Sequence, residues 1–379
     1  LPFWRVLPLT TRFTLRNLFR SWKRSLMTIL AIGGAASLLI TSFCMHDSAY
    51  FFVDHQYHKV IHGDATLKFR NFLGFQGQID LSKIPGIFYY ETYFPLTVTF
   101  RNGNLQKKGV ILGLPPDPKL RTPRKKDGSL IFIPSEGLVL TQKMAENLHV
   151  QKGDILFFQP IEGKRKWFSV PVKEIVQEYV GLSVYASSRY LARLMGESFT
   201  FSQSAVKVIP KKESLFFRKL KKLPSLAGYS NIKEERHLLE GLLVENMLVM
   251  IFTALFFGGI MYLGAIYNHT LVSLGERSKE IALLRVLGFT SKEVSLQLFQ
   301  ENMILLGLGT ILGFPLGYLL SKIVVLELNT DLYRFPLVIY QESYLWTLLL
   351  GILFGVFAHW IVVQKVKSFP WLEEINLRE

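Results

Sequence analysis

The chain has 379 residues, of which 49% are hydrophobic and 19% charged, and its mean hydropathy is +0.26. The charged share lies below the roughly 25% of ordinary soluble domains, which argues against a wholly soluble protein and favours one partly in lipid. The formal net charge is +15, and the single cysteine, Cys44, excludes an intrachain disulfide.

Four windows are long and apolar enough to cross a hydrocarbon core, which takes about 20 residues. None of them contains Lys, Arg, Asp or Glu, and a soluble protein would have to bury all four. They span residues 26–45, 247–267, 302–321 and 344–363. These windows predict a membrane protein with four transmembrane α-helices.

The first two windows are separated by residues 46–241, a segment long enough to form its own core. Patterns in it predict strands at 65–70, 94–100 and 204–210, an Asn-Gly hairpin turn at 102–103, and a helix capped by Thr141. The predicted fold is therefore four transmembrane helices in a 1+3 order. A large α+β extracytoplasmic domain is inserted between helices 1 and 2.

The orientation follows from the short flanks, because Lys and Arg are retained on the cytoplasmic side. Thirteen of these residues lie in the leader, the loop between the second and third spans, and the tail, whereas the loop at 327–343 holds only Arg334. Both termini are thus predicted to be cytoplasmic. The predicted parts are a basic leader (1–25), helix 1 (26–45), the extracytoplasmic domain (46–241), a stalk end with helix 2 (242–267), a cytoplasmic loop with a helix (268–299), helix 3 (300–326), an extracytoplasmic loop (327–343), helix 4 (344–363) and a cytoplasmic tail (364–379).

Between the second and third spans lies a charged stretch, GERSKEIALLRVLGFTSKEV. Its apolar residues recur at helical spacing, Arg277 and Glu280 stand at i, i+3, and Gly288 is a natural helix end. Thr290 and Glu293 form a capping box that starts the next helix. The pattern predicts a short amphipathic helix, which alone fits an ordinary interfacial helix as well as a lever that meets a cytoplasmic partner.

The stretch ERSKEIALLRVLG, a Glu at the next span and the spaced glycines after it resemble the signature of FtsX-like, or MacB-like, permeases of ABC systems. The resemblance implies that the loop helix is a coupling element docking on a cytoplasmic ATPase. The residues that match the coupling helix are Glu276, Arg277, Glu280, Ile281, Leu284, Arg285 and Gly288. The chain has no G-x-x-x-x-G-K-[ST] motif, so ATP is expected in a partner chain and no cofactor is expected to bind directly.

The same resemblance implies a non-enzymatic permease of the bacterial inner membrane. The basic leader and the ending LEEINLRE resemble the second unit of tandem permeases, so a second permease unit, fused or separate, is an expected partner. The leading function is ATP-driven extraction or export of a lipid, lipoprotein or peptide. Alternatives are a regulatory mechanotransmission subunit that controls an extracytoplasmic enzyme or signalling partner, and a membrane-anchored binding module unconnected to ATP.

Glycines recur at four-residue spacing in the last two spans. Gly309, Gly313 and Gly317 form a double GxxxG in the third, and Gly351 and Gly355 lie in the fourth. Glycine lets helix backbones approach closely where lipid supplies no hydrophobic drive between helices. We expect close packing at these residues, within this chain or against another permease unit.

Asp54, His58 and His62 fall at i, i+4, i+8 beyond the first span. One carboxylate and two histidines on one helix face can hold zinc. A solvated stalk with a chance histidine cluster is the simpler interpretation, and no metal is expected.

Most of the net positive charge falls in the extracytoplasmic domain. A basic surface attracts anionic lipid headgroups, so membrane lipids are expected partners, along with an extracytoplasmic substrate-carrying protein. Nucleic acid is not expected, because no recognisable binding module is present. The sequence leaves open the substrate, the direction of transport and the oligomeric state.

Overall fold

The computed structural model describes residues 9–125, 127–162, 165–179, 182–221, 223–278, 280, 282–283, 290–330 and 334–367. The chain divides into two compact units. The helical unit comprises Leu1–Ser48, Glu245–Leu326 and Leu337–Glu379, and the sheet unit comprises Ala49–Val244 and Glu327–Pro336.

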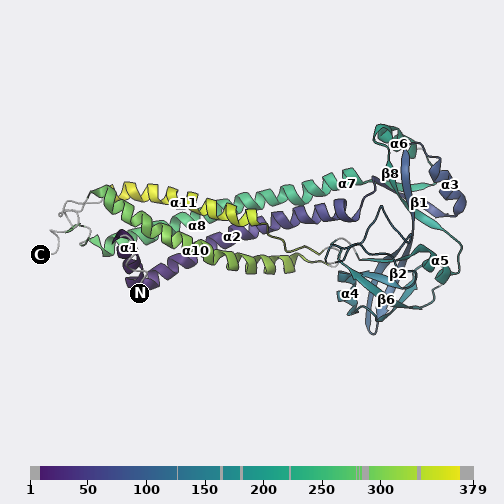
Figure 1. Cartoon of the computed structure of the whole chain (residues 1–379), viewed down its shortest axis with the longest axis horizontal. Helices are drawn as coiled ribbons and strands as arrows, with labels where there is room; N and C mark the ends of the chain where they lie inside the picture. The colour runs from purple at the N-terminus through teal and green to yellow at the C-terminus, as the bar shows by residue number, and fades with distance from the viewer. Residues whose placement is uncertain are drawn as a thin grey trace. The chain divides into compact units, whose positions relative to one another are not determined.

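Four long apolar helices and the short, arginine-containing α1 form the described part of the helical unit (Figure 1). They are α1 (Leu9–Arg20), α2 (Trp22–Asp54), α8 (Asn246–Glu276), α10 (Ser291–Leu328) and α11 (Gln341–Lys367). Among the described residues, four helical stretches are long and apolar enough to cross a membrane: Trp22–Val60, Ile232–Glu276, Glu293–Leu328 and Gln341–Gln364. All four are longer than the predicted windows, because each helix continues into more polar sequence on at least one side.

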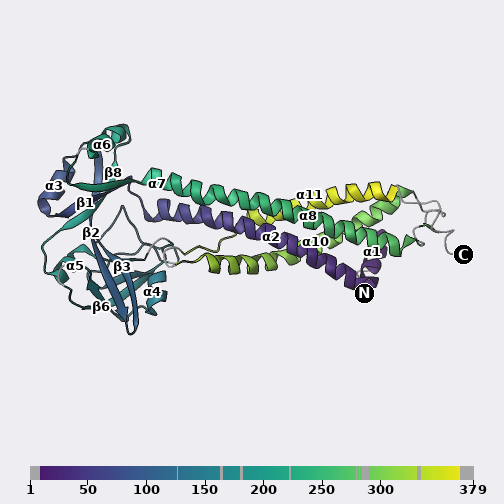
Figure 2. The same cartoon turned by 180° about the vertical axis from the view of Figure 1, so that it is seen from behind.

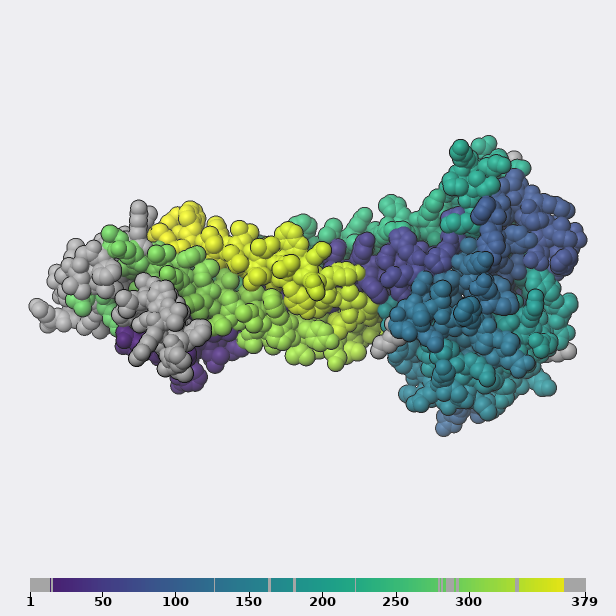
Figure 3. All heavy atoms as spheres, in the orientation of Figure 1, coloured from purple at the N-terminus to yellow at the C-terminus, as the bar shows by residue number. Residues whose placement is uncertain are grey.

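Helix α2 lies at the centre of the helical unit. The share of the most apolar window that is buried is 56% for α2, against 22% for α8, 33% for α10 and 28% for α11. From behind, α8 runs beside α2 (Figure 2), and Gly258 of α8 faces Leu39 of α2. On the opposite side, α11 and α10 lie next to each other (Figure 3), where Gly355 meets Leu306.

In the described part of the sheet unit, the structure contains nine strands and several short helices. The strands are β1 (Ala65–Leu73), β2 (Ile87–Asn102), β3 (Leu105–Leu114), β4 (Leu138–Thr141), β5 (Ile155–Pro160), β6 (Phe168–Val176), β7 (Ser183–Ser187), β8 (Phe201–Val208) and β9 (Leu226–Asn231). The α-helices are α3 (Phe75–Ser82), α4 (Gln142–Leu148), α5 (Ser188–Met195), α6 (Glu213–Leu220) and α7 (Ile232–Leu239). Two π-helical turns, η2 (His55–Val60) and η4 (Glu240–Glu245), and a 3₁₀ turn, η3 (Pro210–Lys212), complete the unit.

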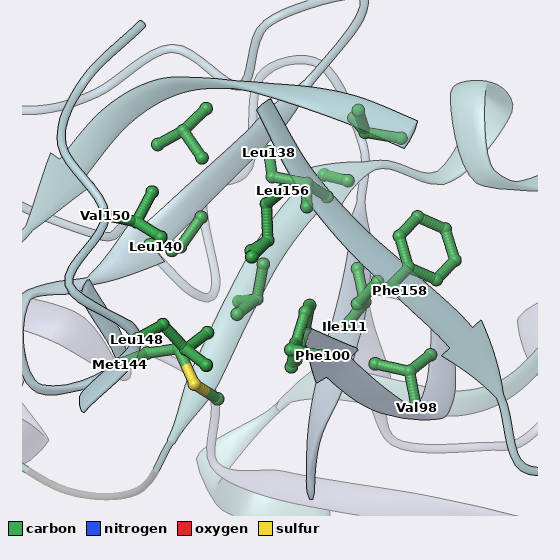
Figure 4. Close-up of a cluster of buried hydrophobic side chains, with 14 of the residues drawn as sticks. Val98, Phe100, Ile111, Leu138, Leu140, Met144, Leu148, Val150, Leu156 and Phe158 are labelled. Carbon is green, nitrogen blue, oxygen red and sulfur yellow. The ribbon is translucent and has the colours of Figure 1, made fainter. Parts of the chain in front are cut away.

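Strand β2 belongs to two sheets. Its residues 94–102 pair with β3, and the order β3-β7-β4-β6-β5-β2 closes into a ring of six strands. Its residues 87–93 pair with β8, which continues through β1 to β9. Val98 and Phe100 of β2, Leu156 of β5 and Met144 of α4 converge in the core of the ring (Figure 4). The long shared strand therefore ties two hydrophobic cores together.

The predicted strands at 65–70 and 94–100 are confirmed, and the third predicted strand is β8, which ends at Val208. The predicted hairpin turn is also present, with Gly103 at φ +57 between β2 and β3. Thr141 occupies the N-cap position of α4, but its side chain makes no capping hydrogen bond, so that part of the prediction is wrong. Its buried hydroxyl lacks a hydrogen-bond partner.

Part of the predicted loop at 327–343 packs on the sheet unit. The Arg334 backbone N–H donates to the carbonyl oxygen of Tyr179 at 3.0 Å, and its guanidinium pairs with Glu146 of α4 at 2.7 Å. The ring of Phe335 stacks on that of Phe52. Arg334, which is the one Lys or Arg residue in the predicted loop at 327–343, thus binds a carboxylate of the sheet unit.

Candidate coupling site

The candidate site begins where α8 ends. Arg277 is its C-cap residue, and its backbone N–H donates to the carbonyl oxygen of Ser273 at 3.2 Å. The next described residues, 278, 280, 282 and 283, are helical. Ala282 is buried, whereas Glu280 and Leu283 are exposed, Leu283 to 61%. The other predicted coupling residues, Ile281, Leu284, Arg285 and Gly288, lie outside the described residues.

A buried carboxylate joins the end of α8 to α10. Two nitrogens of the Arg277 guanidinium donate to the carboxylate of Glu301 at 3.1 and 3.3 Å, and Glu301 is only 1% exposed. Nε2 of His269 lies 3.3 Å from the same carboxylate, and its Nδ1 lies 3.2 Å from the hydroxyl of Thr28 in α2. The network spans three helices, and removing Arg277 or Glu301 would leave the other charged group without its ionic partner.

Two exposed ion pairs connect the predicted coupling acids to the basic leader. Glu276 pairs with Arg24, and Glu280 pairs with Arg20 at 3.0 Å. The side chains of Arg20 and Glu280 are 78% and 54% exposed, so their pair stabilises the fold little. The expected partner of Arg277 was Glu280, but its guanidinium instead binds Glu301.

Sequence reasoning did not find His269 or the partners of Glu301. The family resemblance indicated a Glu at this span, but not what it binds. The sequence did contain a general signal for Glu301. An ionisable residue in an apolar membrane helix is energetically costly, so it is by default a candidate functional residue. The predicted capping box before this helix is confirmed, since the Thr290 backbone N–H donates to Glu293 at 2.7 Å and the Glu293 N–H to the Thr290 hydroxyl at 3.4 Å.

The glycines of the third span face α2. A Cβ atom placed on Gly313 would lie 2.4 Å from the Cβ of Ala36 and 3.0 Å from the carbonyl oxygen of Gly33. At Gly309 and Gly317 an added Cβ would meet Ile32 at 2.6 Å and Ile40 at 2.8 Å. These three glycines therefore pack within the chain, in a contact that we call the glycine seam. In α11, Gly351 faces Tyr262 and Gly355 faces Leu306.

The candidate metal ligands are not brought together. Nδ1 of His58 lies 2.6 Å from Asp54, and its Nε2 faces the guanidinium of Arg236. Nε2 of His62 instead meets the hydroxyl of Thr122 at 3.0 Å. Burial lowers the pKa of His62, and nearby cations lower it further. In the part of the chain that the structure describes, no three His, Cys, Asp or Glu residues form a group that could hold a metal ion.

Comparison with known proteins gives a family match. Residues 248–370 match the family described as FtsX-like permease C-terminal. A search of curated proteins gave no match. Similar solved structures include the extracellular domain of the noncanonic ABC-type transporter YknZ from Gram-positive bacteria, which is 14% identical and covers 45% of this chain and 98% of its own. The periplasmic region of MacB from Actinobacillus actinomycetemcomitans is also 14% identical, and the alignment covers 50% of this chain and 97% of that one. Both have a TM-score of 0.32, so we base the functional assignment on the family match.

Proposed function

We propose that this chain belongs to the FtsX-like permease family, which the match over residues 248–370 supports, and that it is the permease subunit of an ABC-type system whose ATP is hydrolysed by a separate cytoplasmic ATPase. The four apolar helices among the described residues and the family match support a multi-pass protein of the inner membrane. In this proposal the segment around Glu280 docks on the ATPase. The resulting motion passes through the long helices to the sheet unit.

The contact between Arg277 and Glu301 supports the coupling role most directly. Arg277 is the first residue after α8, so its bonds to a buried carboxylate of α10 fix the start of the coupling segment to both helices. A force on the segment would then reach both helices instead of being absorbed in a loose loop. The candidate span that contains α8 extends from Ile232 to Glu276, so it includes residues of both units.

The finer parts of the proposal rest on charge and on family resemblance. Both termini are cytoplasmic, the helices cross in a 1+3 order, and the sheet unit lies outside. The transported substrate is a lipid, lipoprotein or peptide, and a second permease unit completes the assembly. In the alternative, the same motion controls an extracytoplasmic enzyme and nothing is transported. ATP-dependent release of substrate from vesicles would favour transport, and its absence despite normal ATP turnover would favour control.

The orientation is tested by cysteine labelling of whole cells in a Cys44→Ser background. Lys152→Cys and Glu280→Cys place exposed thiols in the sheet unit and the coupling segment. An impermeant reagent should label the first and reach the second only after the cells are opened. Labelling of Glu280→Cys but not of Lys152→Cys in intact cells would refute the proposed topology.

Docking is tested by replacing the exposed leucine of the segment. Leu283→Ser should weaken co-purification with the ATPase and reduce ATP turnover in the complex. Leu296→Ser in α10 is the matched control, since Leu296 is 56% exposed and lies outside the segment. Wild-type binding and turnover by Leu283→Ser, or equal losses in both variants, would count against docking at this position.

A further inference from the structure

Two helical segments of the sheet unit run side by side, and we call them the stalk (Figures 1 and 2). One consists of residues 49–60, the end of α2 with η2, and the other of residues 232–244, α7 with most of η4. Asp54 and His58 from the first segment meet Arg236 and Glu240 from the second. These four side chains form one connected polar network across the stalk.

The partners of His58 match the hydrogen-bonding pattern of a neutral imidazole. The Asp54 carboxylate can only accept, so Nδ1 of His58, 2.6 Å away, must carry a proton. The Arg236 guanidinium can only donate, so Nε2, which it faces, must be an unprotonated acceptor. This arrangement matches a neutral imidazole with its proton on Nδ1. Within the second segment, the Nε–H of Arg236 donates to the carboxylate of Glu240 at 2.6 Å.

Both stalk segments change their helical winding at this network. His58 lies within η2, and Glu240 is the first residue of η4. π-Helical turns are rare, occur mostly as single turns within α-helices, and are frequent at functional sites. One such turn accompanies the polar network in each of the two segments. The backbone of both segments therefore departs from the regular α-helix at the level of the network.

Solvent protons can reach His58. Its side chain is 51% exposed, and it lines a cavity of about 230 Å³. Besides His58, Arg236 and Tyr57, the charged or titratable groups lining this cavity are His62, Asp64, Lys207 and Lys233. Lys207 is bound to Asp64, Lys233 is bound to Glu213 of α6, and His62 is hydrogen-bonded to Thr122. Arg236 is therefore the cation that Nε2 of His58 faces directly.

We propose that Asp54, His58, Arg236 and Glu240 form a latch that holds the stalk segments together while His58 is neutral and releases them when it is protonated. A proton from water would bind Nε2, converting the acceptor into a donor that confronts a second cation. The bond of His58 to Asp54 and that of Arg236 to Glu240 would remain, so the polar link between the segments would be lost. Apolar packing of Phe52 and Val53 with Leu239 and Leu243 also joins the two segments, and the protonated imidazolium would act against it. This inference rests on the proposed function for its purpose, since a releasable stalk would make transmitted motion depend on external pH.

The test uses the full chain in lipid, without ATP or ATPase, so that its outcome is independent of the proposed coupling. Spin labels are placed at Tyr50→Cys and Leu242→Cys in a Cys44→Ser background, because these two residues are 56% and 62% exposed on opposite stalk segments. Distances are measured at about pH 8 and about pH 5, on either side of the ordinary histidine range. We expect one short distance at the higher pH and a longer population at the lower pH.

Three variants isolate the latch. His58→Gln keeps a donor and an acceptor without titrating, and it should abolish the pH response. Arg236→Gln should give the longer population at both pH values. His237→Gln replaces the neighbouring exposed histidine of α7 and should respond like the wild type.

Two results would overturn the proposal. One is a wild-type distance that does not change with pH, and the other is a His58→Gln variant that responds like the wild type. A short distance in Arg236→Gln at about pH 8 would exclude the latch itself. None of these results would affect the proposed coupling to an ATPase, which is measured separately by turnover.

Discussion

Helix α2 makes two contacts of opposite character along its length. In the helical unit it packs against α10 through the glycine seam, where added Cβ atoms would lie as close as 2.4 Å to a neighbour. In the sheet unit, its end and η2 meet α7 through Asp54, His58 and Arg236, in a network whose histidine is half exposed. Close-packed backbones leave no room for sliding, whereas exposed polar contacts stabilise by at most about 1 kcal/mol. One stretch of the helix is suited to stay fixed and the other to be released.

The polar network at Glu301 tests whether burial, and not polarity, determines how much a contact contributes to stability. It is as polar as the latch but almost wholly buried. Glu301→Ala should lower the free energy of unfolding by about 3–5 kcal/mol, because Arg277 would lose its buried partner. Denaturant unfolding in detergent micelles measures this loss. Glu293→Ala, which removes an exposed carboxylate of the same helix, is the control and should cost about 1 kcal/mol. Equal losses in the two variants would mean that burial does not matter here.

The glycine seam is tested by adding volume at its tightest point. Gly313→Val should destabilise the helical unit by about 1–3 kcal/mol, because its methyl groups would force the α2 and α10 backbones apart. Gly307→Val is the matched control, since a Cβ atom there meets nothing within 4 Å. The same unfolding measurement applies. Comparable stability of both variants would show that α2 and α10 do not need this close approach.

The smallest effect is expected at the exposed pair of Arg20 and Glu280. Arg20→Ala should change the free energy of unfolding by less than about 1 kcal/mol, and the change should shrink at high salt. Arg24→Ala provides a comparison at the better-covered neighbouring pair, where the arginine side chain is 16% exposed. If Arg20→Ala cost as much as Glu301→Ala, exposure would be a poor guide to which contacts can be released.

The sequence was most informative about local features. An uncharged apolar window has few interpretations, alternation with period 2 indicates strands, and the capping box of Thr290 and Glu293 depends on residues three apart. These predictions concern interactions between near neighbours in the chain. They are therefore specified by the segment itself.

Long-range partners could not be predicted in this way. Arg236 lies 178 positions from His58, so the sequence showed Asp54, His58 and His62 only as a chance cluster or a less favoured metal site, without the arginine. Arg277 binds a carboxylate that helix packing brings to it from 24 residues away. The closed ring likewise depends on the parallel pairing of β3 with β7 and of β4 with β6, for which no local pattern exists.

The central claim is that motion enters at the coupling segment and reaches the stalk through Arg277 and Glu301. The most direct measurement is the distance between labels at Tyr50→Cys and Leu242→Cys in the complex with the ATPase, with and without bound nucleotide. We predict a nucleotide-dependent distance in the otherwise unaltered chain, and its loss in Arg277→Gln while the ATPase stays bound. A label distance that does not change with nucleotide would contradict the account. So would an Arg277→Gln variant whose label distance changes with nucleotide as much as in the unaltered chain.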